Sequence, residues 1–215
     1  AGGAADTLYF GGGTPSLMAP GDIELLICET RSIFRLSPDA EITAEANPGS
    51  VPQPLEWLSA VKAAGVNRVV VGVQSLDDTQ LEFLGRMHSA AQAVEFYEAA
   101  RRVGIPSLGV DLIYGLPDGD EESWRRTLSR VAGMGPDHVS IYCLEIPPGT
   151  PLRRALGAGE FTECEAGVQE RMYRAARAVL DDAGCRQYEI SNFARPGCEC
   201  RHNLAYWTGA DYLGF

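Results

Sequence analysis

The sequence predicts an α/β fold built from consecutive βα units. Apolar or alternating runs typical of strands recur at spacings of 34, 27, 39 and 31 residues, about the length of one strand, one helix and two loops. These runs are centred near Leu8, Ile42, Val69, Leu108 and Val139. Amphipathic segments with a helical period separate them. Units of this kind form either an open doubly wound sheet or a barrel, and the spacing alone leaves both open.

The first predicted strand runs directly into a glycine turn. Leu8, Tyr9 and Phe10 are followed by residues 11–13, all glycine, and then by Thr14. Glycines expose backbone amides at the end of a strand, where the amides can hydrogen-bond a carboxylate, a phosphate or an amino-acid group. The Thr14 hydroxyl can add to such a site. The same run can also be no more than a flexible turn.

Helix faces and helix boundaries are legible between the strands. Apolar residues share one face in three stretches: Ile23, Leu26, Ile27, Ile33 and Phe34; Val94, Tyr97 and Ala100; and Trp124, Leu128 and Val131. The predicted helix starts are Pro52, Ser89 and Asp120. The predicted helix ends, where a left-handed cap favours glycine, are Gly65, Gly104 and Gly135.

The organisation changes after Glu145. Residues 146–151 are rich in proline and therefore predict a loop that leaves the preceding strand. A long helix follows and ends at Gly184, and residues 187–193 predict another strand. The apolar stripe of that helix is Val168, Met172, Ala176, Val179 and Leu180. We therefore expect two parts, the βα units in residues 1–150 and a C-terminal α+β accessory segment in residues 151–215.

Polar side chains stand at the predicted C-terminal ends of the strands. These ends converge on one face in both architectures. Glu45, Gln74 and Asp111 lie there, and because a buried carboxylate without a partner is costly, we expect a ligand to supply partners. Arg86 can hold a carboxylate through its planar fork. Taken singly, these residues can also be a capping carboxylate, a core amide and a solvated arginine.

Five segments carry a resemblance to a known family. They are GGGTPS, EANPGS, GVQSLDDTQLEFLGRMHSA, GVDLIYGLPD and YEISNFARPGCECRHNLAYW. In this order, over almost the whole chain, they resemble radical SAM proteins related to oxygen-independent coproporphyrinogen III oxidase. The resemblance implies a partial, six-unit TIM-like (β/α)6 barrel that binds a [4Fe-4S] cluster and S-adenosylmethionine (SAM). It implies that Gly12, Gly13 and Thr14 meet the methionine part of SAM, and that the rest of the site is lined by Glu45, Gln74, Arg86 and Asp111.

The C-terminal motif points to one branch of that family. Residues 202–207 resemble the HNxxYW signature of the HemW branch, whose members are regarded as haem chaperones. The resemblance implies that His202 ligates haem while Tyr206 and Trp207 offer flat apolar faces to the macrocycle. The implied partners are haem or a porphyrin and a haem-accepting respiratory protein. A histidine beside two aromatic residues can also be a packed corner with a locally bonded imidazole.

The cysteines do not match the cluster motif of that family. The six cysteines are Cys28, Cys143, Cys164, Cys185, Cys198 and Cys200, none at the CxxxCxxC spacing that holds a radical SAM cluster. Cys198 and Cys200 form a CxC pair, but two thiolates alone do not complete a tetrahedral metal site. We therefore expect a fragment truncated at both ends, without the first barrel strand and the cluster loop, and inactive in reductive cleavage of SAM. The alternative is a natural homologue that has lost its cluster.

Composition bounds the remaining function classes. A formal net charge of -11 disfavours nucleic-acid binding. No apolar run is long enough to span a membrane, and scattered cysteines suit a reducing compartment, so we expect a cytoplasmic protein. Three functions stay open: a haem-binding chaperone, anaerobic decarboxylation of coproporphyrinogen III, and an ordinary βα-barrel enzyme that binds a phosphorylated metabolite at residues 11–13.

Overall fold

The computed structural model describes residues 4–215 and has one seven-stranded sheet in the order β1-β2-β3-β4-β5-β7-β6. Strands β1 to β5 are parallel neighbours, whereas β7 pairs antiparallel with β5 and with β6. The strands are β1 (Thr7–Phe10), β2 (Glu41–Ala46), β3 (Arg68–Gln74), β4 (Ser107–Tyr114), β5 (His138–Cys143), β6 (Arg186–Gln187) and β7 (Asn192–Ala194). The predicted α/β class with consecutive βα units is confirmed.

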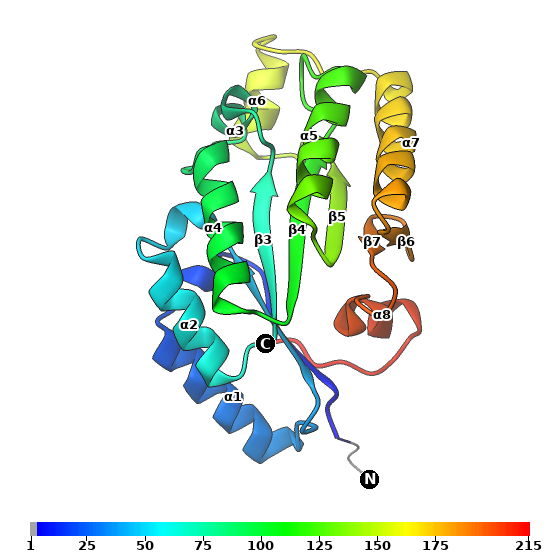
Figure 1. Ribbon diagram of the computed structural model, residues 1–215. Helices are drawn as coiled ribbons and strands as arrows, with labels where there is room; N and C mark the ends of the chain where they lie inside the picture. The colour runs from blue at the N-terminus through cyan, green and yellow to red at the C-terminus, as the bar shows by residue number, and fades with distance from the viewer. Residues whose placement is uncertain (1–3) are drawn as a thin grey trace.

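Helices line one face of this sheet (Figure 1). The helices are α1 (Pro20–Phe34), α2 (Pro54–Ala64), α3 (Asp78–Phe83), α4 (Ala90–Val103), α5 (Glu121–Met134), α6 (Pro151–Gly157), α7 (Ala166–Asp182) and α8 (Arg201–Trp207). Two 3-10 turns, η1 (Pro15–Leu17) and η2 (Pro48–Ser50), follow β1 and β2. Helices α1, α2, α4 and α5 cover the parallel strands, and α7 packs beside α5. Among residues 4–215 no helix has the length and apolarity needed to cross a bilayer.

Side chains alternate between the two faces of each strand. Ile42, Val69 and Leu108 point to the helices and are at most 2% exposed, in a core shared with α1, α2, α4 and α5. Their neighbours Thr43 and Arg68 point to the opposite face and are also buried. The residues that face the helices are almost all apolar, which explains the valine and isoleucine in these strands. The second face, unlike the helix face, is polar.

Local signals fix most helix boundaries as predicted. Ser89 and Asp120 are N-caps whose side chains accept a hydrogen bond from the backbone amide of the third helical residue. That third residue, Gln92 in α4 and Ser123 in α5, accepts a hydrogen bond in return from the backbone amide of the N-cap residue, which makes a capping box. The predicted glycines form left-handed C-caps with φ of +113°, +75° and +69°, namely Gly65, Gly104 and Gly135. The long C-terminal helix, α7, is confirmed as well.

Three details of the sequence prediction are wrong. Helix α2 starts at Pro54 rather than Pro52, because Gln53, which precedes a proline, stays outside the helical conformation at φ −126° and ψ 78°. On α1, Leu26 and Ile33 are 44% and 64% exposed, since they lie to one side of the buried face. Residues 187–193 form a hairpin of two short strands rather than one strand. The turn at 188–191 is closed by hydrogen bonds from the Tyr188 amide to the Asn192 carbonyl and from the Ser191 amide to Glu189.

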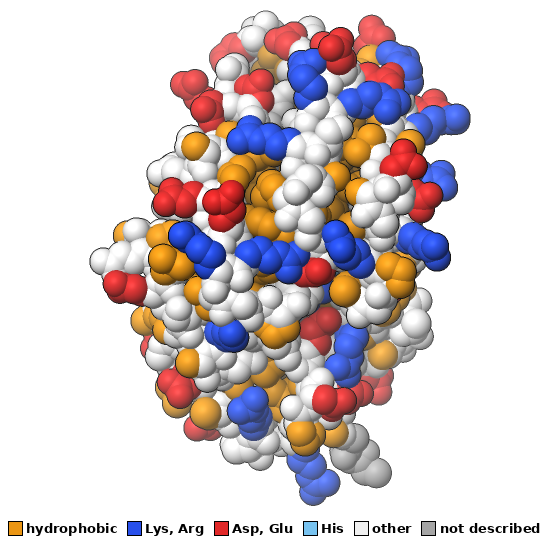
Figure 2. Space-filling view, viewed as in Figure 1, with side chains coloured by type: hydrophobic (Ala, Val, Ile, Leu, Met, Phe, Trp, Pro, Cys, Tyr) orange, Lys and Arg blue, Asp and Glu red, His pale blue; other side chains and the backbone are white. Residues whose placement is uncertain are grey.

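The division of the chain at residue 151 stays a prediction. Thr150 caps α6, where its hydroxyl accepts a hydrogen bond from the Arg153 amide. Beyond it, β7 and β6 continue the same sheet as β1 to β5, and α8 lies against β1. On the face that Figure 2 shows, acidic and basic side chains are interspersed over the helices.

Removal of the α4 cap tests this account of the helix boundaries. We expect Ser89→Ala to lower the free energy of unfolding by about 1 kcal/mol, because the amide of Gln92 loses its acceptor at the helix start. Urea denaturation measures the change. Ser59→Ala, at an exposed position inside α2, is the matched control and is expected to change stability by no more than about 0.5 kcal/mol. Equal effects of the two substitutions would contradict the assignment.

Candidate functional site

The glycine turn after β1 exposes bare backbone, as the sequence predicts. A side chain at Gly11 would lie 2.6 Å from the Tyr9 ring and 3.1 Å from Glu45 Oε1, so only glycine fits there. Gly12 and Gly13 have φ of +74° and +55°, and no atom lies within 4 Å of where their Cβ atoms would be. The turn is therefore an open surface at the C-terminal end of β1, next to Glu45.

Glu45 is tied to β1 through Tyr9. The Tyr9 hydroxyl donates to Glu45 Oε1 at 2.8 Å. Burial, followed by the negative charge of Glu45, raises the pKa of Tyr9 far above its usual range, so the phenol stays protonated and the bond keeps this direction. Glu45 thus has one oxygen engaged with the protein and a second oxygen with remaining acceptor capacity.

Asp111, on β4, carries a carboxyl group with a deeply buried oxygen. Its Oδ1 is buried and has no hydrogen-bond partner among the described residues. Burial raises the pKa of Asp111 to about 7; Glu45 adds to the rise, whereas the Ser140 hydroxyl and the charges of Arg68 and Arg86 lower it. An orphaned oxygen on a carboxyl group that is half-charged near neutral pH fits a site for a hydroxyl or a cation.

Gln74 and Arg86 complete the C-terminal edge. Gln74 has φ of +66°, an uncommon conformation for a residue other than glycine, at an irregularity of the β3–β4 pairing. Its side chain folds back over Gly72, which is the register partner of Asp111. Arg86 is partly buried; burial lowers its pKa and the charge of Asp111 opposes that shift. Glu45 and Arg86 are thus close enough to Asp111 for their charges to act on it, and Gln74 lies over the register partner of Asp111.

The sequence prediction missed two residues that shape this edge. His88 bonds Asn47 Oδ1 at 3.1 Å and the Val73 carbonyl at 3.3 Å, and so joins the ends of β2 and β3. Burial lowers the pKa of His88, which favours its neutral form. Tyr9, the other residue, holds Glu45. His88 lies within a segment that carries the family resemblance, and Tyr9 lies two residues before another such segment, but the contacts of both are visible only once the strands are paired.

The C-terminal motif lies at the opposite end of the strands. His202, on α8, bonds the Thr7 hydroxyl through Nδ1 at 2.8 Å and the Tyr206 hydroxyl through Nε2 at 3.1 Å. Its ring stacks on Tyr9 with 5.1 Å between centroids. Burial lowers the pKa of His202, so its imidazole is neutral near pH 7. The structure thus brings His202 and Tyr206 together, apart from the glycine turn, and leaves Trp207 beside them 56% exposed.

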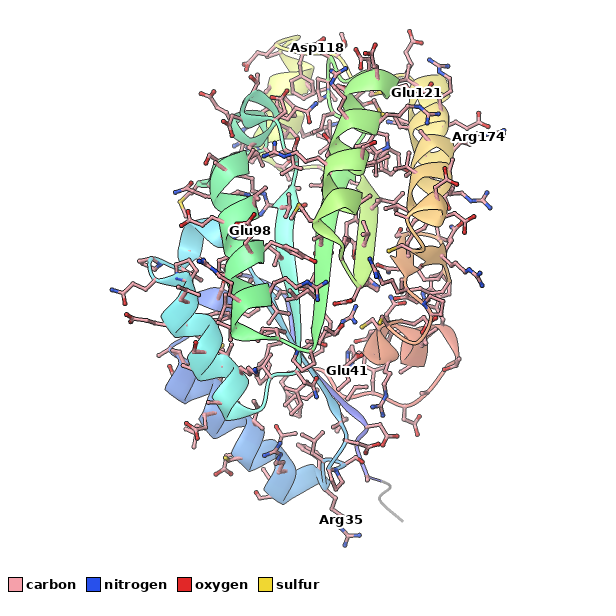
Figure 3. All side chains as sticks on the ribbon, viewed as in Figure 1. Arg35, Glu41, Glu98, Asp118, Glu121 and Arg174 are labelled. Atoms are coloured by element: carbon pink, nitrogen blue, oxygen red, sulfur yellow. The ribbon has the colours of Figure 1, made fainter. Side chains whose placement is uncertain are left out.

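A carboxylate from β2 docks α8 on the second face of the sheet. Glu41 accepts hydrogen bonds from the amides of Arg201 and His202, both at 3.1 Å, and from the Cys200 thiol. Figure 3 labels Glu41 between the ends of the strands and α8. A negative charge at the first amides of a helix is favourable. This contact spans 160 residues of sequence, so the position of α8 depends on the folded sheet.

The cysteines do not form a metal centre. All six are free, and residues 4–215 hold no group of three histidine, cysteine or acidic side chains placed to bind a metal ion. The described residues therefore do not fit a [4Fe-4S] cluster. The glycine turn with the orphaned oxygen of Asp111 fits a polar organic ligand instead.

Comparison with known proteins identifies the family. The model of the Radical SAM superfamily matches residues 1–131 of this chain. The chain belongs to the radical SAM superfamily. This radical SAM protein is 42% identical over 209 residues to "Radical S-adenosyl methionine domain-containing protein 1, mitochondrial" of Mus musculus, an alignment that covers 97% of this chain and 47% of the mouse protein.

Other relatives of this radical SAM protein carry the name "Heme chaperone HemW". Those of Mycobacterium tuberculosis and Escherichia coli are 39% and 36% identical, over 97% of this chain and 53% of theirs. The structure of coproporphyrinogen III oxidase (HemN) from Escherichia coli superposes with a TM-score of 0.78 at 28% identity, over 95% of this chain and 46% of HemN. The chain thus spans about half the length of the relatives it matches, and the expected TIM-like radical SAM fold is confirmed.

The buried carboxyl group makes stability depend on pH. Because the pKa of Asp111 is about 7 in the folded protein and about 4 when unfolded, the folded state binds more protons between these values. The contribution of this proton to the stability of the folded protein is therefore greatest below about pH 4 and is lost as the pH rises through 7. We expect Asp111→Asn to gain about 2–3 kcal/mol relative to the wild type between pH 5 and pH 8.

Urea titrations at the two pH values measure this difference. The matched control is Asp118→Asn, at an exposed loop position labelled in Figure 3, whose difference from the wild type is expected to be the same at both pH values. An Asp111→Asn variant that gains nothing on going from pH 5 to pH 8 would show that Asp111 is charged throughout.

Proposed function

We propose that this radical SAM protein binds SAM at the C-terminal ends of β1 to β4 and binds haem at α8, in the manner of a haem chaperone. The observation that carries the SAM site is the orphaned Oδ1 of Asp111 beside a side-chain-free glycine turn. The resemblance to radical SAM proteins also implies a [4Fe-4S] cluster in the full-length protein. None of the 215 residues is assigned to that cluster, because no CxxxCxxC triplet occurs among them.

The chemistry of SAM matches the groups at this edge. The N–H groups of Gly12 and Gly13 can donate to the methionine carboxylate, and Arg86 suits the same carboxylate. The Thr14 hydroxyl can accept a hydrogen bond from the methionine amino group. A ribose has two neighbouring hydroxyls, and carboxylate oxygens accept hydrogen bonds from such hydroxyls well. Glu45 and Asp111 supply the carboxylates. Negative charge from these carboxylates also favours the sulfonium cation. Gln74 has both a donor and an acceptor for the remaining polar atoms.

The SAM site is tested by removing one charge. We expect Glu45→Gln to weaken SAM binding at least tenfold, since the carboxylate that accepts the Tyr9 hydroxyl becomes a neutral amide. Isothermal titration calorimetry on the full-length protein measures the change. Glu98→Gln, on the outer face of α4 in Figure 3, is the matched control and is expected to bind SAM like the wild type.

The outcomes of that titration separate two functions. Equal affinities of wild type, Glu45→Gln and Glu98→Gln would remove Glu45 from the site. Stabilisation of the protein by phosphate esters, but not by SAM, would favour the ordinary βα-barrel enzyme with a phosphorylated substrate at the glycine turn.

The surroundings of His202 suit a haem ligand. Thr7 holds Nδ1, and a partner on one ring nitrogen fixes the tautomer and the direction of the other, as in many metal sites. Nε2 of His202 is hydrogen-bonded to the hydroxyl of Tyr206, so this hydrogen bond has to break before Nε2 can bind iron. Tyr206 and Trp207 are about half exposed, at 49% and 56%, so a macrocycle can reach their faces. A neutral imidazole is the ligating form.

Haem binding is tested with two substitutions on α8. We expect His202→Ala to abolish the shifted Soret band that haem shows with the full-length protein. We expect Tyr206→Phe to keep the band and to tighten binding several-fold, because Nε2 no longer has a competing hydroxyl. His88→Asn is the histidine control and is expected to leave the spectrum unchanged. A Soret band that survives His202→Ala with the same affinity would exclude His202 as the ligand.

Coproporphyrinogen III oxidase activity is the second candidate. The superposition on HemN, which covers 95% of this chain, favours it. Anaerobic conversion of coproporphyrinogen III by the full-length protein would establish this activity. The haem chaperone is preferred because the HNxxYW motif is present at α8, and a haem-accepting respiratory protein is its proposed partner. A cytoplasmic location is also proposed; the mouse relative is named as mitochondrial.

A further inference from the structure

A second polar site lies between the sheet and α8, away from the glycine turn. It is a cavity of about 180 Å³ on the polar face of the strands. Strands β1, β3, β5 and β7 and helix α8 all contribute to its wall. Its polar lining residues include Tyr9, Arg68, His138, Ser140, Asn192 and Asn203.

Arg68 is the residue of this cavity that most strongly indicates a ligand, because part of its guanidinium is buried without a partner. The residue is only 2% exposed. Its Nη1 donates to the Ser107 hydroxyl at 2.9 Å and to the Cys198 carbonyl at 3.2 Å. Its Nε and Nη2 are buried and have no hydrogen-bond partner among the described residues. A buried guanidinium with two unsatisfied nitrogens is strongly unfavourable unless an anion pairs with it.

Two carboxylates on the same face of the sheet, Glu41 and Asp111, form no ion pair with this guanidinium. Glu41 accepts from the first two amides of α8 and from the Cys200 thiol. Asp111 feels the charge of Arg68, but it belongs to the edge proposed for SAM. Within residues 4–215 Arg68 forms no ion pair, so the missing negative charge is expected from a ligand.

Other unsatisfied groups surround the same place. His138 Nδ1 and Asn203 Oδ1 are buried without partners among the described residues, as is the hydroxyl of Thr43, the register partner of Arg68. The hydroxyl and the imidazole can each donate one hydrogen bond, and the Asn203 amide can turn its NH2 group toward an acceptor. His138 and Asn203, which line the cavity, and Thr43, which is paired with Arg68 in the sheet, therefore supply donors near one positive charge.

We propose that this cavity is a binding site for a carboxylate, held by Arg68. The two free nitrogens, Nε and Nη2, form one edge of the guanidinium, and that edge matches the two oxygens of a carboxylate in a bidentate pair. One guanidinium neutralises one carboxylate, whereas a phosphate dianion would leave a second charge uncompensated. A volume of about 180 Å³ suits a small acid or the acidic arm of a larger molecule.

The carboxylate has two possible sources. Tyr206 lines the cavity, so the propionate of a porphyrin on α8 can enter it; a free carboxylic acid can enter it equally well. The shared chemistry is the carboxylate, and occupancy by a free acid does not require haem at α8. Failure of haem binding would therefore leave this site standing.

The first experiment observes Arg68 in the unaltered protein. In full-length protein labelled with 15N-arginine, the Nε–H resonance of Arg68 is assigned by its absence in Arg68→Lys. We expect sodium propionate to shift this resonance in a saturable manner, and propionamide, its neutral analogue, to leave it in place. Inorganic phosphate is expected to shift it less than propionate does. The proposal would be overturned if the chemical shift of the Arg68 Nε–H resonance did not change with propionate, or changed equally with propionamide.

The second experiment identifies the source. Arg68→Met removes the charge, and Arg177→Met at an exposed position of α7 is the matched control. A loss of at least tenfold in haem affinity for Arg68→Met, with no loss for haem dimethyl ester, supports a porphyrin propionate. Unchanged haem affinity together with the propionate shift supports a free acid. If Arg68→Met does not fold, the comparison of haem with its dimethyl ester on the 15N-labelled wild type gives the same distinction.

Discussion

Alternation of side chains along five parallel strands is the constraint on which this structure depends. One set of residues, such as Ile42 and Val69, packs against the helices, so the other set must share the opposite face. That second set contains Tyr9, Glu45 and Asp111. Because parallel strands point in one direction, the polar residues near their C-terminal ends meet at one edge, next to the glycine turn.

The polar face leaves buried polar atoms without partners, which is unfavourable for stability unless a ligand supplies the partners. The buried oxygen of Asp111 and the free edge of the Arg68 guanidinium are unsatisfied within the described chain, although each could be replaced by an apolar side chain at lower cost. Tyr9 stands between the two regions, since its hydroxyl holds Glu45 and its ring stacks on His202. The edge proposed to bind SAM and the helix proposed to bind haem therefore share one side chain.

Local sequence predicted those parts of the fold that local interactions determine. The caps at Ser89 and Gly104 need only a few neighbouring residues, and both are confirmed. The hairpin at 186–194 was missed because its register is set by pairing with β5. The contacts of Glu41 with α8 and the burial of Arg68 were also invisible, since they join residues about 130–160 positions apart. The family and its fold were predicted from motifs, and comparison confirmed them, whereas the roles of the site residues rest on proposal.

The central claim is that scattered residues form one SAM site at the C-terminal edge of the strands. A crystal structure of the full-length protein with SAM tests it most directly. We expect the methionine group on the amides of Gly12 and Gly13, and the ribose hydroxyls within hydrogen-bond distance of Glu45 and of the Asp111 oxygen that is now unpartnered. SAM bound at another surface, with Glu45 still bonded only to Tyr9 and Asp111 unchanged, would contradict the claim.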